Sequence, residues 1–263
     1  MKNDPYKKAG VDIKAGNDLV DKIKKDLAGT FDKNVLSGIG SFSGFYSLPK
    51  GFKNPVLVAC TDGVGTKVAL AQKNSSLRTI GQDLVAMCVN DMITSGAHPL
   101  FFLDYFASSK LDVNETATVI KGIAKACKKT NCSLIGGETA EMPNHYIGKN
   151  FDLAGFSVGV VEKKLIIDSS KVRKNNIIIG IESSGAHSNG YSLINKLIKE
   201  SKLSKSERER LVKLALKPTH LYTNVILDLI KKVKVSQLLI LLEVVLQKIF
   251  LDQFLIPYPL KYI

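Results

Sequence analysis

Residues 61–67 read TDGVGTK and follow directly on the apolar run PVLVAC. Gly63 and Gly65 allow close backbone approach and positive φ, so several N–H groups could point at one anion. The spacing is not that of the nucleotide P-loop, in which four residues separate a glycine from Gly-Lys-Ser/Thr. Because a carboxylate beside a phosphate is repulsive unless a cation lies between them, Asp62 indicates Mg²⁺ with a phosphate on its far side. The alternative is a tight turn, since Gly and Asp are common turn residues.

Three carboxylates stand in similar settings along the chain. Asp62 follows an apolar strand, Asp91 lies in the middle of a predicted helix with little other charge, and Glu138 follows a strand and a Gly-Gly pair. A charged side chain on an apolar helix is costly unless it has a partner. Taken singly, each carboxylate has the simpler interpretation of a solvated or capping group. Together, as oxygen ligands from three separate elements, they suit a Mg²⁺ that bridges nucleotide phosphates.

Residues 183–193, SSGAHSNGYSL, form the second candidate site. Small and polar residues lead here into the start of a helix, where free backbone N–H groups bind anions. His187 lies inside this candidate anion loop and titrates near neutral pH, so it could contact a substrate. A single histidine is more often structural, and His98, His145 and His220 have no clear companions in the sequence.

The elements that must position these residues alternate between helix and strand, which is typical of α/β or α+β proteins. Apolar residues at helical spacing predict the first helix, and apolar runs bounded by Pro, Gly or Asp predict the strands. The predicted helices cover residues 16–28, 79–95, 112–129, 205–216 and 223–233, and residues 187–200 are predicted to form a loop and a helix. The predicted strands cover 55–62, 100–107, 132–135, 152–163 and 176–185. The polar segment 162–175 is the expected domain boundary.

The net charge of +13 does not indicate a nucleic-acid-binding protein, because only four of the 37 basic residues are Arg and there is no Trp. Base-reading Arg and stacking aromatic residues are typical of that class. The four cysteines form no CxxC pair, which indicates core residues of a reducing compartment. The N-terminus lacks the apolar stretch of a signal peptide. We therefore expect a cytoplasmic protein that binds neither nucleic acid nor membrane.

Seven stretches of the chain together resemble one known family. They are, in order, YKKAGVDIKAGNDLV, GIGSFSGFYSLP, PVLVACTDGVGTK, DLVAMCVNDMITSGAHPLFFLDYFA, GGETAEMP, DLAGFSVGVVEK and SSGAHSNGYSL. They resemble the phosphoribosylformylglycinamidine cyclo-ligases, the aminoimidazole ribonucleotide synthetases of purine biosynthesis, from about residue 6 to about residue 236. Related ATP-using enzymes such as thiamine-phosphate kinases share the acidic metal pattern but lack the long DLVAMCVND…FFLDY and GGETAEMP strings.

The resemblance implies a fold, a dimer and a nucleotide site. In that family the N-terminal domains of two chains pair into a shared barrel, and ATP lies near the interface with its phosphates bridged to carboxylates by Mg²⁺. We therefore expect an α+β or α/β chain that forms a homodimer, with a mixed sheet in its N-terminal domain. By motif match, the implied metal ligands are Asp62, Asp91 and Glu138; the implied nucleotide surroundings are Gly63, Gly65, Thr66, Lys67, Asn90, Gly136, Gly137 and Thr139; and the implied site for an anionic group of substrate or nucleotide is Ser188, Asn189 and Gly190, with His187 nearby.

The implied activity is the ATP-dependent cyclisation of formylglycinamidine ribonucleotide to 5-aminoimidazole ribonucleotide, with release of ADP and phosphate. The γ-phosphoryl group would go to the formyl-amide oxygen, and the amidine nitrogen of the same molecule would attack the activated carbon and expel phosphate. Positioning and charge stabilisation supply most of the rate in such chemistry, and His187 is a candidate proton shuttle. Two alternatives stay open: another ATP-dependent enzyme of the superfamily, such as a small-metabolite kinase, and a nucleotide-binding dimer module without turnover.

The resemblance stops after Ser236. The family continues with a segment like AIAHITGGGF, whereas this chain reads QLLILLEVVLQKIFLDQFLIPYPLKYI. The family-like continuation AIAHITGGGFTKNIPRSIPDTLS can be written with mostly AT-rich codons. When the first base of that DNA is removed, the shifted reading frame encodes residues 237–259 as they stand here. We therefore infer a one-base deletion after Ser236. We expect residues 1–164 to form an ATP- and Mg²⁺-binding dimerisation domain, 165–236 the first part of an incomplete α/β domain, and 237–263 an out-of-frame tail. Activity of a chain truncated in this way is expected to be impaired.

Overall fold

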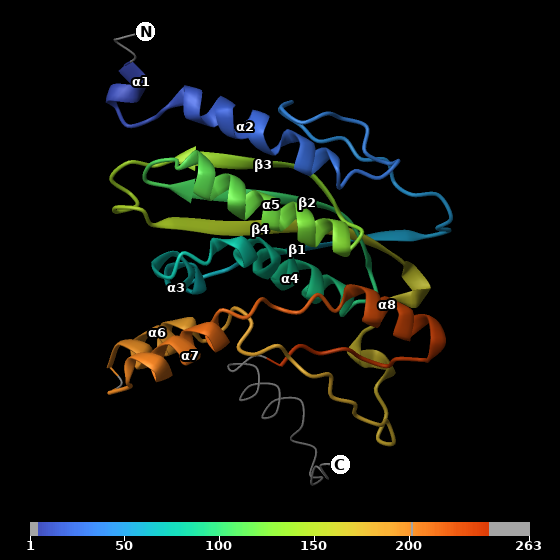
Figure 1. Ribbon diagram of the computed structural model, residues 1–263. Coiled ribbons are helices and arrows are strands. Elements are labelled where there is room, and N and C mark those ends of the chain that lie inside the picture. The colour runs from blue at the N-terminus through green and yellow to red at the C-terminus, as the bar shows by residue number, and fades with distance from the viewer. Residues whose placement is uncertain (1–4, 201, 242–263) are drawn as a thin grey trace.

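The structure, a computed structural model, describes residues 5–200 and 202–241, which form a mixed α/β arrangement (Figure 1). The helices are α1 (Pro5–Lys8), α2 (Ile13–Ala28), α3 (Lys67–Lys73), α4 (Ile80–Ile93), α5 (Val113–Lys129), α6 (Tyr191–Glu200), α7 (Lys205–Ala215) and α8 (Thr223–Lys232). The strands are β1 (Pro55–Gly63), β2 (His98–Ser108), β3 (Ser133–Glu141) and β4 (Phe151–Glu162). The expected mixture of helices and strands is confirmed.

The strands form one four-stranded sheet in the order β1-β4-β2-β3. Strand β4 runs antiparallel to both β1 and β2, whereas β2 and β3 are parallel, so the sheet is mixed as expected. One row of register partners crosses the whole sheet and consists of Asp62, Gly155, Asp104 and Gly137. Side chains of one such row point to the same face, and the next residue along each strand points to the opposite face.

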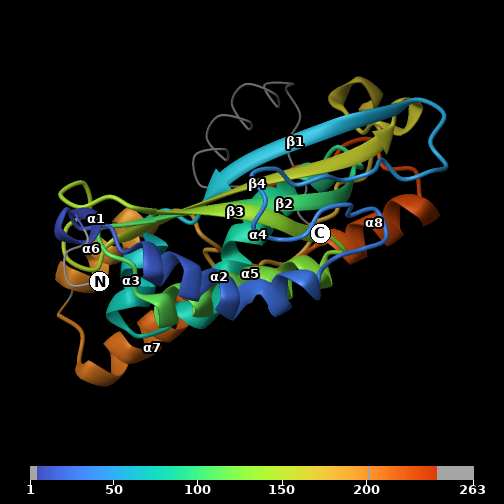
Figure 2. The same ribbon diagram turned by 90° about the horizontal axis from the view of Figure 1, so that it is seen from above.

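Helices α2, α4 and α5 cover one face of the sheet (Figure 2). The Asp12 side chain caps α2 by accepting from the Ala15 N–H at 3.2 Å. Asp112 caps α5 by accepting from the N–H groups of Asn114 and Glu115 at 3.0 and 3.1 Å. These contacts satisfy amides that the first turn of a helix leaves free. Nearly all of α4 is buried between the sheet and α5, which explains its apolar sequence.

No described helix covers the other face of the sheet (Figure 2). Leu57 on β1 is 62% exposed and Phe156 on β4 is 46% exposed. Large apolar side chains this exposed on neighbouring strands are typical of a surface that another molecule covers. We call this surface the open face; it includes Leu57, Phe101, Leu103, Tyr105 and Phe156.

After β4 the described chain contains only helices and irregular segments. Helix α8 packs against α4 and adds Ile226 and Leu227 to the main core. Helices α6 and α7 form a smaller cluster with α3, in which Leu70, Tyr191 and Ala215 are buried together. The second half of the chain is therefore attached to the first through α3 and α4 (Figure 1).

Three local expectations are wrong. The predicted strand 176–185 does not form, because it has no partner strand among the described residues, and Ile177 and Ile179 are 85% and 79% exposed. Asp91 lies in the last turn of α4 rather than in the middle of a helix, since α4 ends at Ile93. Glu138 lies inside β3 rather than in a turn after it, since the strand continues through the Gly-Gly pair.

The expected out-of-frame tail lies outside the described residues from position 242 onward. Within the described ranges, no helix is both long enough and apolar enough to cross a membrane. All four cysteines are free, and three of them are buried, as expected for core residues.

Candidate functional site

Two of the predicted metal ligands, Asp62 and Asp91, lie together. Asp62 is near the end of β1, on the face of the sheet that α4 covers, and its backbone oxygen accepts from the Cys88 thiol of α4 at 3.8 Å. Asp91 lies about one turn further along α4. Desolvation by the surrounding chain and, second, the negative charge of Asp62 raise the pKa of Asp91 to about 6. The two carboxylates therefore share one site and repel each other.

The third predicted ligand, Glu138, lies on the opposite face of the sheet. Its register partner on β2 is Tyr105, one residue beyond the row that contains Asp62. Because neighbours along a strand alternate, Glu138 points to the open face, and it is exposed. Gly136, Gly137 and Thr139 lie beside it on β3. Among the described residues, no three His, Cys, Asp or Glu side chains are grouped so that they could hold a metal ion.

The pair of Asp62 and Asp91 nevertheless suits Mg²⁺ bound together with phosphate groups. Mg²⁺ usually binds proteins through one or two carboxylates plus substrate phosphates and several waters, rather than through a complete set of protein ligands. A divalent cation beside both carboxylates would relieve the repulsion that contributes to the raised pKa of Asp91. The donor set therefore fits this ion without Glu138 of the same chain.

The loop after β1 carries the chain from the carboxylate pair into α3. Gly65 has a φ of +63°, in the left-handed region where a side chain is strained. The Gly63 N–H donates to Asp62 Oδ1 at 2.7 Å. The carbonyl of Thr66 accepts from Asn195 Nδ2 of α6 at 3.1 Å. The loop thus connects the site of Asp62 to the second half of the chain.

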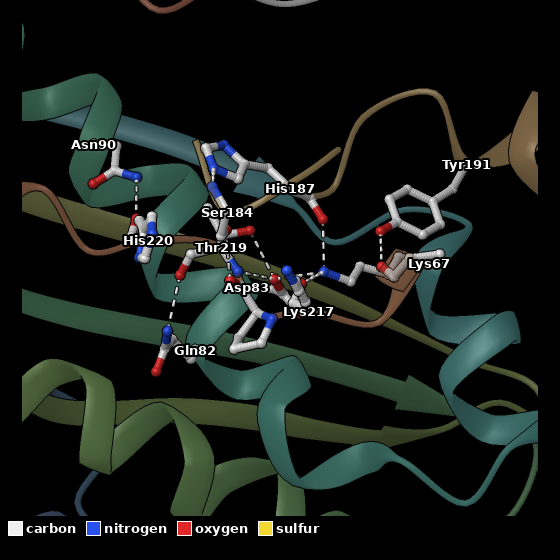
Figure 3. Close-up of polar contacts among 12 residues, drawn as sticks. Lys67, Gln82, Asp83, Asn90, Ser184, His187, Tyr191, Lys217, Thr219 and His220 are labelled. Carbon is white, nitrogen blue, oxygen red and sulfur yellow. Dashed lines mark hydrogen bonds and ion pairs between the residues drawn. The ribbon is translucent and has the colours of Figure 1, made fainter. Parts of the chain in front are cut away.

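Lys67, which the resemblance places among the nucleotide surroundings, lies in the interior of the described chain. Its side chain is 0% exposed, and its ammonium donates to Asp83 and to the backbone oxygens of His187 and Lys217 (Figure 3). An ammonium has three N–H donors, and all three are used. Enclosed in this way, Lys67 has no donor left for a phosphate.

A small pocket opens between α4 and the loop 183–190. Its walls include Asn90, Asp91, His187, Asn189, Thr219 and Tyr222. The pocket thus brings the carboxylate of one candidate site together with the anion loop of the other. Ser188 Oγ and Asn189 Nδ2 are buried and have no hydrogen-bond partner in the described part of the chain. Buried polar atoms of this kind require a partner, which a bound ligand could supply.

His187 is held in an unusual conformation at the edge of this pocket. Its φ is +54°, in the left-handed region, and its Nε2 accepts from the Ser184 N–H at 3.4 Å. Burial lowers the pKa of His187, and the neighbouring His220 and Lys67 lower it further. The imidazole is therefore neutral at pH 7 and able to accept a proton. Gly190, with a φ of +71°, then leads into α6.

The sequence did not single out Tyr222, which lines the pocket, or His220, which contacts Asn90 and Tyr222. Asn90 donates to the His220 carbonyl at 2.8 Å and accepts from the Tyr222 N–H at 3.1 Å. The Tyr222 ring contacts two imidazoles, and its centroid lies 6.0 Å from that of His187 and 5.7 Å from that of His220. The stretch KPTHLY, with polar and aromatic residues between two predicted helices, is the signal that could have indicated this wall.

Two family models match the chain. The model described as AIR synthase related protein, N-terminal domain, matches residues 51–161. The model described as AIR synthase related protein, C-terminal domain, matches residues 173–237. The first match contains Asp62, Asp91 and Glu138, and the second contains the loop 183–190.

Several solved structures share the fold. Thiamine-monophosphate kinase from Stenotrophomonas maltophilia K279a has 18% identity and a TM-score of 0.53, over 81% of this chain and 63% of that chain. The hydrogenase maturation protein HypE of E. coli has 13% identity and a TM-score of 0.53, over 81% of this chain and 61% of that chain. A further HypE structure has 18% identity and a TM-score of 0.51, over 78% and 58%. This chain therefore spans about three fifths of the length of these proteins.

Proposed function

Because the chain belongs to the AIR synthase related superfamily, we propose that it binds ATP with Mg²⁺ and uses ATP to activate and cyclise formylglycinamidine ribonucleotide. The products would be 5-aminoimidazole ribonucleotide, ADP and phosphate. The strings DLVAMCVND and GGETAEMP, which resemble the cyclo-ligases, support this substrate over others of the superfamily.

The observation that carries the proposal is the position of the Asp62–Asp91 pair. The Asp91 carboxylate lines the same pocket as His187 and Asn189. The glycine-containing loop begins next to Asp62. A cation-binding pair, a loop with accessible amides and a neutral histidine are the parts that phosphoryl transfer followed by proton transfer requires.

The residues present can be given distinct roles. Asp62 and Asp91 would hold Mg²⁺, which when bound neutralises phosphate charge. The backbone amides of Gly65 and Thr66 would bind phosphate oxygens, whereas the Gly63 amide is already bonded to Asp62. Ser188, Asn189 and Gly190 would bind an anionic group of the substrate, helped by the free amides and the dipole at the start of α6.

His187 would accept the proton that the amidine nitrogen loses as the ring closes. Its lowered pKa keeps the imidazole neutral, and thus basic, at pH 7. Asn90 would act indirectly, because its amide is already bonded to the backbone of His220 and Tyr222, and so fixes the wall beside His187.

The open face supports a homodimer as part of this proposal. Packing two open faces together would bury Leu57 and Phe156, which are exposed in the single chain. The same packing would turn Glu138, with Gly136, Gly137 and Thr139 beside it, toward the other protomer. Residues 1–164 would then be the nucleotide-binding and dimerisation domain, and residues 165–236 would belong to the second domain.

Product analysis tests the proposal. The purified chain is incubated with ATP, Mg²⁺ and formylglycinamidine ribonucleotide, and the products are identified by mass spectrometry. We expect 5-aminoimidazole ribonucleotide and one ADP per ring closed, with turnover reduced at least about 100-fold in Asp62→Asn. A new phosphate ester would show a kinase instead, and ATP binding without ADP release would show a binding module; either result would contradict the cyclisation.

A further inference from the structure

The Lys67 ammonium binds three acceptors in the interior of the molecule (Figure 3). It donates to Asp83 Oδ1 at 2.8 Å, to the His187 carbonyl at 2.6 Å and to the Lys217 carbonyl at 2.8 Å. The side chains of Lys67 and Asp83 are both 0% exposed. The ammonium also lies 5.4 Å from the centroid of the Tyr191 ring. This arrangement leaves water no access to the charge.

Asp83 accepts its hydrogen bonds through one of its two carboxylate oxygens. Its Oδ1 accepts from Lys67 and also from Thr219, through the N–H at 2.8 Å and the hydroxyl at 2.7 Å. Its Oδ2 is buried and has no hydrogen-bond partner in the described part of the chain. Lys67 is also the one residue with which Asp83 forms a salt bridge among the described residues. The carboxylate therefore depends on Lys67.

The three acceptors come from segments far apart in the sequence. Asp83 belongs to α4, whereas the carbonyls of His187 and Lys217 lie 120 and 150 residues beyond Lys67. Lys67 itself is the first residue of α3, directly after the loop that contains Gly63 and Gly65. One side chain thus links the loop beside Asp62, helix α4, the loop 183–190 and the segment before α8.

The buried pair of Lys67 and Asp83 has different effects on stability and on the geometry of the site. Desolvation of two charges offsets most of their attraction, so a buried ion pair is weak evidence of added stability. Its donors and acceptors, however, have directions, and a buried group left without its partner is destabilising. The His187 carbonyl belongs to a residue with a φ of +54°, a conformation that persists only where the surroundings hold it.

We propose that Lys67 is a positioning residue that fixes the loop 183–190 at the pocket through the His187 carbonyl, rather than a ligand of phosphate. Asp83 holds the ammonium in place and, through Thr219, holds the segment that carries Lys217. The Lys67 residue thereby connects the loop that contains Gly63 and Gly65 to the loop 183–190. This role does not depend on which reaction the site catalyses.

The test compares variants of the whole chain by backbone hydrogen exchange and by chemical denaturation. In Lys67→Met we expect exchange in residues 183–190 to accelerate at least about tenfold, while β2 and α5 stay as protected as in the unchanged protein. Lys73→Met is the matched control, since Lys73 is an exposed lysine at the other end of the same helix. It should leave exchange in residues 183–190 unchanged.

The double variant Lys67→Met/Asp83→Asn distinguishes positioning from mere stability. It removes both charges and keeps an oxygen for Thr219, so the midpoint of denaturation should recover relative to Lys67→Met. Residues 183–190 should nevertheless stay fast to exchange, because the carbonyls of His187 and Lys217 still lack a donor. Restored protection in the double variant, or unchanged exchange in Lys67→Met, would overturn the proposal. So would a double variant that cannot fold, because the ammonium would then serve the fold as a whole.

Discussion

Asp104 is an acidic side chain in the middle of the sheet, with no ion-pair partner in the described part of the chain. It lies on the covered face, in one row with Gly155 and Gly137. A Cβ on Gly137 would lie 2.3 Å from Asp104 Oδ1, so the glycine makes room for the carboxyl. Burial raises the pKa of Asp104 to about 7.

This pKa predicts a pH dependence of stability. Between about pH 4 and pH 7 the folded chain holds a proton on Asp104 that the unfolded chain has lost, so the free energy of unfolding falls as pH rises through that range. Asp104→Asn removes this contribution. Relative to that of the unchanged protein, the free energy of unfolding of the variant should increase by on the order of a few kcal/mol between pH 4 and pH 7. Above pH 7 the difference should increase no further. Urea denaturation at several pH values measures the difference, and a difference that is constant with pH would contradict the assignment.

At the scale of residues, the sequence predicted which residue types form the site better than it predicted where their side chains point. Asp62 and Asp91 were expected at one site and do lie together, because each stands at the end of an element that packs against the other. Glu138 points to the opposite face of the sheet, which the sequence did not indicate, since one step along a strand reverses the face. Lys67 was expected among the nucleotide surroundings, and nothing in TDGVGTK indicates that its partners lie as far away as residue 217.

Helices α4 and α5 approach each other closely at two glycines, Gly81 and Gly122. A Cβ on Gly81 would lie 2.3 Å from the backbone nitrogen of Ile123 and 2.4 Å from the Val119 oxygen. Such contacts are with backbone and cannot be relieved by a change of side-chain rotamer. The position of α4, and therefore of Asp91, depends on this close contact.

Substitution of Gly81 tests this packing. Gly81→Ala should destabilise the chain by about 3 kcal/mol or more, because α4 and α5 must separate. Gly16→Ala in α2 is the matched control, since a Cβ there meets nothing within 4 Å. It should stabilise by about 0.5–1 kcal/mol, the usual difference between Ala and Gly inside a helix. Denaturant titration measures both, and equal effects at the two positions would contradict the close packing.

At the scale of elements, the first half of the chain was predictable because its patterns are long and local. Helices α2, α4 and α5 and the four strands of the sheet were each expected from periodicity and flanking turn residues, whereas the short helix α3 was not. The expected strand 176–185 shows the limit of that approach. Its apolar composition is typical of a buried strand, but a strand also needs a hydrogen-bonded neighbour, and none is present among the described residues.

The molecule has one sheet face covered by helices and one left apolar and exposed, while its net charge is +13. Net charge of this size opposes unspecific association of copies of the chain. A specific homodimer through the open face would therefore have to gain its stability from burial of apolar side chains such as Phe156 and Leu57.

A single charge on the open face tests the dimer. Phe156→Lys would place two ammonium groups in the apolar interface, so we expect the dimer dissociation constant to rise at least about 100-fold. Val225→Lys is the control, because Val225 is also an exposed apolar residue, at 59% against 46% for Phe156, but lies on α8 away from the sheet. Sedimentation velocity distinguishes monomer from dimer. A Phe156→Lys chain that stays dimeric would show that the open face is not the interface.

The central claim is that the Asp62–Asp91 pair binds ATP through Mg²⁺. Isothermal titration of ATP in the presence of Mg²⁺ and in the presence of EDTA tests it most directly, with Asp91→Asn beside the unchanged chain. Asp228→Asn, an exposed aspartate on α8 paired with Lys231, is the control. The account predicts that ATP binds with Mg²⁺, that affinity falls at least about tenfold with EDTA or in Asp91→Asn, and that Asp228→Asn is unaffected. Equal ATP affinity with and without Mg²⁺, or undiminished affinity in Asp91→Asn, would contradict it.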